Sequence, residues 1–157
     1  MILCSHLGQP AGYDIKLSFA ALLENLILKT GEKISLLKEL KRPQKSGVYL
    51  LENIRFDKRE YTNCPSLSLE LAQMADLCFF EALACSHRPH ASIYQLARHE
   101  KTQLGNFAKK EIKHWQKIRD VKKSFYMIGG VKASTKIPLI KHIIKNTEVF
   151  IFGAIAH

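Results

Sequence analysis

The chain has 157 residues, which is enough for one ordinary domain and too few for two full-sized lobes. Hydrophobic residues make up 46% and charged residues 24% of it, a composition that places it among globular proteins and excludes a low-complexity chain. The formal net charge of +10, from 24 Lys and Arg against 14 Asp and Glu, favours anionic partners: nucleic acid, acidic membranes or phosphorylated metabolites.

Neither a membrane span nor a signal peptide is visible in the sequence. No apolar run approaches the ~20 residues that cross a bilayer, and residues 1–4 lack the charged region and long apolar stretch of a signal peptide. We therefore expect a cytoplasmic protein with no membrane partner. None of the four cysteines belongs to a C-x-x-C pair, and we expect all four to be reduced. Cys85, His87 and His90 are metal-ligating residue types, but no fourth ligand follows at a suitable spacing, so we predict no metal site.

Short apolar runs alternate with longer helical patterns along the chain, which is typical of βαβ units. Strands are expected at residues 2–4, 34–37, 48–51, 77–80, 125–128 and 149–152. Helices are expected at residues 15–30, 66–75 and 134–146, and a basic helix is expected to end near Asp120. Gly31 is the predicted stop of the first helix, and Ser66 is the predicted N-cap of the second. This order predicts an α/β fold in three layers, with a mostly parallel sheet and helices on both faces.

The basic helix has one apolar side. Its apolar residues follow the three-and-four spacing of a helix with one buried stripe, from Leu104 through Trp115 to Ile118. Its basic residues are Lys109, Lys110, Lys113, His114, Lys117, Arg119, Lys122 and Lys123. A solvated face opposite a packed one explains this charge. No zinc, RRM or KH signature accompanies it, so nucleic-acid binding stays a minor alternative.

A pair of glycines follows the strand predicted at 125–128. Gly129 and Gly130 allow close approach to the backbone, and Lys132 and Lys136 come at the start of the next helix, where free N–H groups attract anions. The segment is either an anion site or only a tight strand-to-helix turn, and it is not a Walker A loop. Pro138 is tolerated if Thr135 caps that helix, and removes a hydrogen bond if the helix begins earlier.

Four segments together resemble the phosphoglycerate kinase family. Cys4–Pro10 (CSHLGQP) is similar to its S-H-L-G-R-P loop, and Leu50–Phe56 (LLENIRF) to its L-L-E-N-[LIV]-R-F. Ser86–Ser92 (SHRPHAS) is similar to A-H-R-A-H-A-S, and Ile128–Lys136 (IGGVKASTK) to I-G-G-[AS]-K-V-S-[DT]-K. Because all four occur in the family's order, their joint occurrence is far more specific than any one of them.

The resemblance implies functional roles for eight residues. His6, Leu7, Gly8, Gln9, Arg55 and Arg88 would form the basic patch that holds 3-phosphoglycerate. Lys132 would be the catalytic residue that stabilises the transferring phosphoryl group, and Lys136 would contact the phosphates of ATP or ADP, with Mg²⁺ as the metal of the nucleotide. The family reaction, in glycolysis, is ATP plus 3-phosphoglycerate giving ADP plus 1,3-bisphosphoglycerate.

The chain also departs from the family pattern. Gln9 replaces an arginine, Phe80–Ala84 (FEALA) replaces N-D-A-F-G or M-D-A-F-G, and Thr102–Phe107 replaces a turn of the A-G-P-L-[LM] type. We expect residues 1–108 to be a partial substrate lobe, residues 109–120 a connecting helix, and residues 121–157 the start of the nucleotide lobe. By this interpretation the chain is a truncated and degenerate homologue that lacks the family's first strand and most of its nucleotide lobe.

Two functions remain open from the sequence. One is a phosphoglycerate kinase-like protein that is inactive as an isolated chain. Its expected ligand is 3-phosphoglycerate. Its expected protein partner is either a separately encoded second lobe or a second copy of this chain that pairs through an exposed sheet edge. The other is a non-catalytic basic module that binds phosphorylated metabolites or nucleic acid without turnover.

Overall fold

The computed structural model describes residues 1–119, 125–145 and 147–156. They form two compact units, residues 1–110 and 111–157, and each unit is described by itself. Helix α4 (Asn106–Arg119) contains the boundary between them. The end of the connecting helix expected at Asp120 lies outside the described residues, so the lobe limits at 108 and 120 stay a prediction.

Three parallel strands form the main sheet of the first unit. They are β1 (Ile2–Leu3), β2 (Ile34–Leu37) and β3 (Val48–Leu51), in the order β1-β3-β2. Ile2 pairs with Tyr49 and Ile34 with Val48, so the carboxyl ends of all three strands meet at one edge. The predicted bounds of β2 and β3 are confirmed, because both runs are apolar and are bounded by polar loops.

A second, separate pair of parallel strands lies in the same unit: β4 (Cys78–Phe80) and β5 (Thr102–Leu104). The predicted parallel pairing is present, but the described strands form separate parallel sheets instead of one continuous sheet. Strand β5 was also missed. Three residues, Thr-Gln-Leu, are too short to show an apolar alternation, and tertiary pairing with β4 decides their conformation.

The helix predicted over 15–30 is broken near its start. A short 3-10 turn (Ile15–Leu17) is followed by extended Ser18, and α1 runs from Ala20 to Thr30. The break has a physical cause: the Glu52 carboxylate accepts hydrogen bonds from the Ser18 hydroxyl at 2.5 Å and from the Phe19 amide at 2.9 Å. Gly31 ends α1 in the left-handed conformation and donates its N–H to Ile27, which confirms it as the helix stop.

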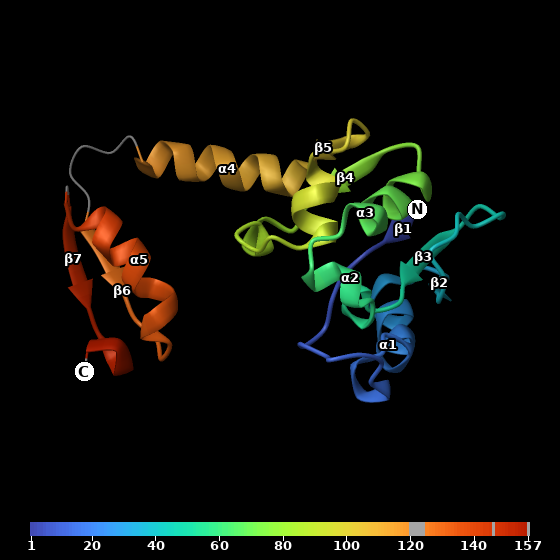
Figure 1. The fold of residues 1–157 in the computed structure, drawn as a ribbon, viewed down its shortest axis with the longest axis horizontal. Helices are drawn as coiled ribbons and strands as arrows, with labels where there is room; N and C mark the ends of the chain where they lie inside the picture. The colour runs from blue at the N-terminus through green and yellow to red at the C-terminus, as the bar shows by residue number, and fades with distance from the viewer. Residues whose placement is uncertain (120–124, 146, 157) are drawn as a thin grey trace. The chain divides into compact units, whose positions relative to one another are not determined.

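The other helices of this unit are short. They are α2 (Lys58–Tyr61), α3 (Pro65–Gln73), 3-10 turns at 54–56 and 83–85, and a π-helical turn (Ala91–Gln95). Pro65 occupies the first position of α3, so the helix begins one residue before the predicted cap at Ser66. Helix α1 packs on β2, while α3 packs on the π-helical turn (Figure 1). Core residues there are Leu51, Ile54, Leu67, Leu71, Met74 and Ala91.

The second unit contains one complete βαβ motif: β6 (Phe125–Ile128), α5 (Ala133–Ile143) and β7 (Glu148–Ile151), with a 3-10 turn at 153–156. Strands β6 and β7 are parallel, with Phe125 opposite Glu148 (Figure 1). Lys132 is at the N-cap position, so α5 begins before Thr135 and Pro138 lies inside the helix. The second alternative for Pro138 therefore holds: it has no N–H to donate to the carbonyl of Ser134.

Replacing this proline should stabilise α5. We expect Pro138→Ala to stabilise the helix by about 2 kcal/mol, somewhat below the ~3 kcal/mol typical of a helix interior, because the residue lies in the second turn. Slower amide hydrogen exchange across 133–143 would report this. Leu139→Ala, at a 53% exposed position of the same helix, is the matched control. Unchanged exchange in Pro138→Ala would contradict the assignment.

Candidate functional site

The loop that follows β1 is held by a side chain from the loop that follows β3. Asn53 is 2% exposed, its Oδ1 accepts from the Leu7 amide at 3.3 Å, and its Nδ2 donates to the carbonyls of Leu7 at 2.8 Å and Leu17 at 3.0 Å. Gly8 follows with φ +63°, and a Cβ there would meet the Leu17 side chain at 3.0 Å. The neighbouring strands β1 and β3 thus bring the Cys4–Pro10 and Leu50–Phe56 segments together at the carboxyl edge of the sheet.

Arg55 lies directly under this loop. It is 3% exposed, and its Nη1 donates to the Gly8 carbonyl. Its other two guanidinium nitrogens, Nε and Nη2, are buried and have no hydrogen-bond partner among the described residues. Leaving a buried donor unpaired costs about 1–3 kcal/mol, and more for a charged group. A buried arginine with two unpaired donors is therefore a candidate anion site.

A second group of titratable side chains faces the same guanidinium. Glu60 is 2% exposed and accepts hydrogen bonds from the Ser92 amide at 2.8 Å and the Ser92 hydroxyl at 2.7 Å. His90 Nδ1 lies 3.6 Å from Glu60 Oε1. These contacts attach the π-helical turn to α2, so the Arg88–Ser92 segment and the Arg55 segment form one cluster.

Burial favours the neutral form of both histidines of the cluster. Burial lowers the pKa of His6 from its ordinary value, and the positive charges of Arg55 and Arg88 lower it further. Burial is also the largest cause of the lowered pKa of His90; Glu60 opposes it, and Arg55 and Arg88 add to it. The same two arginine charges therefore act on both imidazoles. An anion arriving here would offset the positive charges of Arg55 and Arg88.

These lowered values predict how stability depends on pH. A histidine whose folded pKa lies below its unfolded value, near 6.5, binds fewer protons when folded, so the free energy of unfolding falls as the pH drops through that value. We expect urea midpoints to decrease between pH 7 and pH 5. His90→Gln should flatten this slope, whereas His142→Gln, at an exposed position in α5, should not. An equal slope in the wild type and in His90→Gln would contradict the prediction.

The structure places the eight predicted site residues as follows. His6, Leu7, Gly8, Arg55 and Arg88 belong to the one cluster in residues 1–110, and Gln9 is exposed on the same loop. Lys132 and Lys136 belong to the other unit, at the carboxyl end of β6. There Lys136 Nζ donates to the Gly129 carbonyl, and Gly130 has φ +126°. The two groups of residues are therefore two separate local sites, one in each unit.

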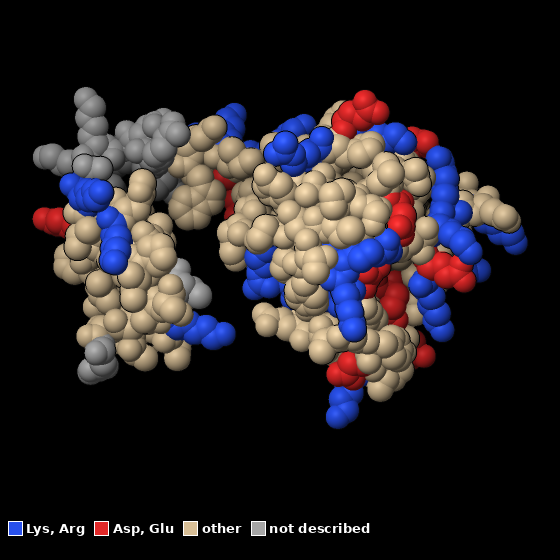
Figure 2. Space-filling view, viewed as in Figure 1, with Lys and Arg blue, Asp and Glu red and all other residues tan. Residues whose placement is uncertain are grey.

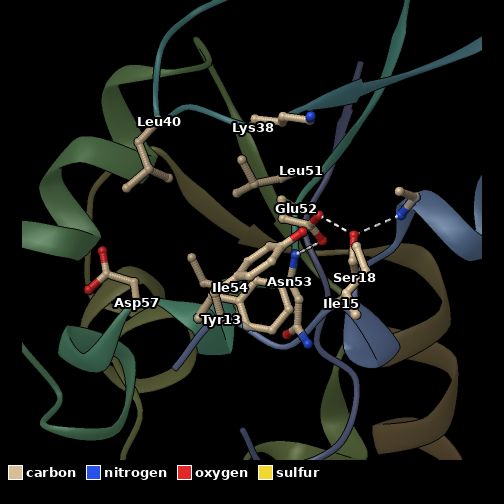
Figure 3. Close-up of a pocket in the computed structure, with 12 residues that line it drawn as sticks. Tyr13, Ile15, Ser18, Lys38, Leu40, Leu51, Glu52, Asn53, Ile54 and Asp57 are labelled. Atoms are coloured by element: carbon tan, nitrogen blue, oxygen red, sulfur yellow. Dashed lines mark hydrogen bonds between the residues drawn. The ribbon is translucent and has the colours of Figure 1, made fainter. Parts of the chain in front are cut away.

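A pocket of about 530 Å³ opens beside the cluster (Figure 3). Its charged lining residues are Lys38, Glu52 and Asp57, and it contains no arginine. Hydrogen bonds from Ser18, Phe19 and Asn53 outweigh burial and lower the pKa of Glu52, so a carboxylate faces the cavity. The remaining lining residues are Tyr13, Ile15, Ser18, Ala20, Leu40, Leu51, Asn53, Ile54 and Phe56. An apolar cavity with two carboxylates does not suit a phosphate.

Sequence reasoning missed Glu60 and the roles of Asn53 and Tyr61. The Tyr61 ring covers Arg55, with its centroid 5.7 Å from the guanidinium carbon. Asn53 stands inside the L-L-E-N segment, where its tolerance for turn conformations was a usable signal. Glu60 gave none, because an isolated glutamate in a polar stretch is usually exposed.

The described residues show neither a metal centre nor a membrane helix. Within them, no group of three or more His, Cys, Asp or Glu side chains is placed to hold a metal ion, Cys85, His87 and His90 included. None of the described helices is long and apolar enough to cross a membrane. On the face shown in Figure 2, Lys and Arg side chains are interspersed with Asp and Glu.

Comparisons with known proteins cover the whole chain. The family model described as phosphoglycerate kinase matches residues 1–157. Phosphoglycerate kinase of Dictyoglomus turgidum is 35% identical over 98% of this chain, and that of Helicobacter pylori J99 is 34% identical over 100%. The cytosolic phosphoglycerate kinase of Nicotiana tabacum is 32% identical over 98%.

The match covers less than half of each relative. The chain spans 41% of the Dictyoglomus and Nicotiana proteins and 42% of the Helicobacter protein. The structure of phosphoglycerate kinase from Coxiella burnetii matches with a TM-score of 0.80 and 26% identity, over 97% of this chain and 41% of that one. Parallel βαβ architecture, the glycine loop over a buried arginine and these matches agree: the chain belongs to the phosphoglycerate kinase family.

Proposed function

We propose that this chain binds 3-phosphoglycerate in the cluster around Arg55. The observation that carries the proposal is the buried guanidinium with two unpaired nitrogens, beside Arg88 and the neutral His6. An anionic oxygen would accept from those nitrogens in charge-assisted hydrogen bonds, each contributing about 1.5–3 kcal/mol. Leu7 and Gly8 shape the loop above Arg55, and the exposed Gln9 would contact the bound anion from the outer end of this loop.

Gln9 sets the expected strength of binding. An amide carries no charge and cannot donate the paired hydrogen bonds of a guanidinium. The binding free energy that an anion gains by contacting Gln9 is therefore smaller than it would gain from an arginine at that position. We therefore propose weak binding of 3-phosphoglycerate, and we expect Gln9→Arg to strengthen it.

The second part of the proposal concerns the nucleotide. Lys132, at the N-cap of α5, would stabilise a transferring phosphoryl group, and Lys136 would contact nucleotide phosphates once it releases the Gly129 carbonyl. Two lysines at a helix N-terminus suit phosphate oxygens. When bound, Mg²⁺-ATP supplies the phosphoryl group, and Mg²⁺ usually takes its ligands from phosphates, waters and one or two carboxylates. No metal ligand is assigned to this chain.

We propose that these 157 residues alone carry out negligible phosphoryl transfer. Transfer needs the donor and acceptor aligned in a water-excluded site, and the chain spans about 41% of its relatives. The proposed setting is a cytoplasmic, three-layered lobe with helices on both faces, and its first proposed partner is a second lobe. A second copy is the other proposed partner, because β1 pairs only with β3 among the described strands and leaves one edge open.

A thermal melt followed by circular dichroism tests the binding. We expect a cooperative transition that rises with 3-phosphoglycerate and not with sulfate of equal ionic strength, since a ligand that binds only the folded state stabilises it by mass action. Equal shifts with both anions would favour the basic module instead. For that module, salt-sensitive binding of a single-stranded RNA would be the direct support.

A further inference from the structure

The side chain of Tyr61 lies against the buried guanidinium of Arg55. Its ring centroid lies 5.7 Å from the guanidinium carbon, within the range of a cation–π contact. The same ring also contacts His90 in an edge-to-face arrangement, with centroids 5.4 Å apart and planes at 75°. Tyr61 itself is 38% exposed, while Arg55 is 3% exposed. The ring is therefore a cover with one open side.

The backbone beneath this ring is fixed by its neighbours. Arg59 pairs with Asp57 at 2.7 Å and with Glu70 of α3 at 2.6 Å, which attaches α2 to α3. Glu60 is held by the amide and hydroxyl of Ser92. Because the residues on the N-terminal side of Tyr61 are anchored, the movement that can uncover Arg55 is rotation of the Tyr61 side chain, which has solvent to turn into.

The cover explains a mismatch in the site. Arg55 has two unpaired donors, yet the residue is only 3% exposed, and it does not line the nearby 530 Å³ cavity. We propose that Tyr61 gates Arg55: its ring must turn toward solvent before the phosphate or carboxylate group of a small organic phosphate reaches the unpaired nitrogens. This rests on the proposed binding of 3-phosphoglycerate at Arg55, and it makes Tyr61 a positioning residue that sets affinity.

The gate is tested first without any ligand, by the reactivity of Arg55 toward phenylglyoxal, measured by peptide mass spectrometry in the full chain. We expect Tyr61→Ala to raise the modification rate of Arg55 at least about fivefold relative to Arg42, while Tyr61→Phe, which keeps the ring, leaves it unchanged. Arg42 is the internal reference because its side chain is 56% exposed and distant in sequence. Equal Arg55 rates in Tyr61→Ala and Tyr61→Phe would overturn the gate.

Affinity for 3-phosphoglycerate is the second readout. If the ring covers the site about nine-tenths of the time, the apparent affinity is about tenfold weaker than that of the uncovered site. Tyr61→Ala should therefore bind 3-phosphoglycerate about tenfold more tightly than the wild type. Adding Arg55→Lys to Tyr61→Ala should remove this gain in affinity. Tighter binding in Tyr61→Ala supports the gate, and weaker binding overturns it. If Arg55 becomes reactive but no variant binds 3-phosphoglycerate, the gate holds and the proposed function fails.

A folding control keeps both readouts interpretable. Tyr61→Gln removes the ring and retains most of the side-chain length, so it should behave like Tyr61→Ala with a smaller change in packing. A cooperative melt is required of each variant before its Arg55 rate is compared. If Tyr61→Ala is unfolded, Tyr61→Gln decides the question on the same criterion.

Discussion

Replacing Arg55 and Arg88 together should abolish detectable binding of 3-phosphoglycerate. Each guanidinium would contribute a charge-assisted contact of about 1.5–3 kcal/mol, so losing both costs about 3–6 kcal/mol, or more than about a hundredfold in affinity. Titration calorimetry at low ionic strength measures this directly, with Arg55→Met and Arg88→Ala as the two changes, because methionine fills much of the buried space that Arg55 occupies.

The matched control changes charge without touching the cluster. Arg42→Met with Arg98→Ala also removes two positive charges, but Arg42 pairs with Asp76 on the surface and Arg98 contacts Tyr94. We expect the control to bind 3-phosphoglycerate as the wild type does. If both double variants lose affinity equally, the net charge of the chain determines binding and the site assignment is wrong.

Asn53→Ala should be among the most destabilising single changes in the first unit. The side chain is 2% exposed and serves four backbone groups: the amides of Leu7 and Arg55 and the carbonyls of Leu7 and Leu17. Removing it leaves buried polar groups without partners, each costing about 1–3 kcal/mol, and we expect a total loss of about 3 kcal/mol or more in the free energy of unfolding. Urea denaturation followed by circular dichroism gives this value.

Two further variants show whether the hydrogen bonds are responsible. Asn53→Asp keeps the oxygen that accepts from Leu7 and Arg55 but loses the donor to the two carbonyls, so it should be destabilised less than Asn53→Ala at neutral pH. Gln103→Ala, at an exposed position of β5, should stay within about 0.5 kcal/mol of the wild type. An Asn53→Ala variant as stable as Gln103→Ala would refute the role given to Asn53.

Sequence patterns predicted the structure best where a signal within a short segment decided its conformation. The bounds of β2 and β3 follow from apolar runs, and Gly31 ended α1 because only a residue tolerant of positive φ fits there. The family followed from four segments in a fixed order. None of these depended on a contact between residues far apart in sequence.

The errors came from contacts between distant residues. Glu52 broke the helix expected over 15–30 by capturing Ser18 and Phe19 across more than 30 positions, and β5 formed because β4 pairs with it. The buried Glu60 contacts Ser92, 32 residues away. A single sequence records the residue types but not these pairings, so it pointed to Arg55 and Arg88 as candidates and missed the groups that contact them.

The burial of Arg55 bears on the proposed substrate patch. A sequence motif predicts an arginine at the surface of a binding loop, whereas the structure has that arginine bonded to the Gly8 carbonyl and covered by the Tyr61 ring. Binding would then require uncovering Arg55 as well as contacting it. Under the proposed gate, affinity would depend on Tyr61 in addition to the residues of the motif.

The most direct test of the account is a titration of the labelled chain with 3-phosphoglycerate, followed by NMR of the arginine side-chain Nε–H groups and the backbone amides. The account predicts saturable shifts of the Arg55 Nε–H and the Gly8 amide, with the amides of Lys110 and Lys113 in α4 unchanged. Shifts confined to the lysines of α4, with Arg55 and Gly8 unmoved, would contradict it and identify the chain as a basic module that attracts anions through its surface charge.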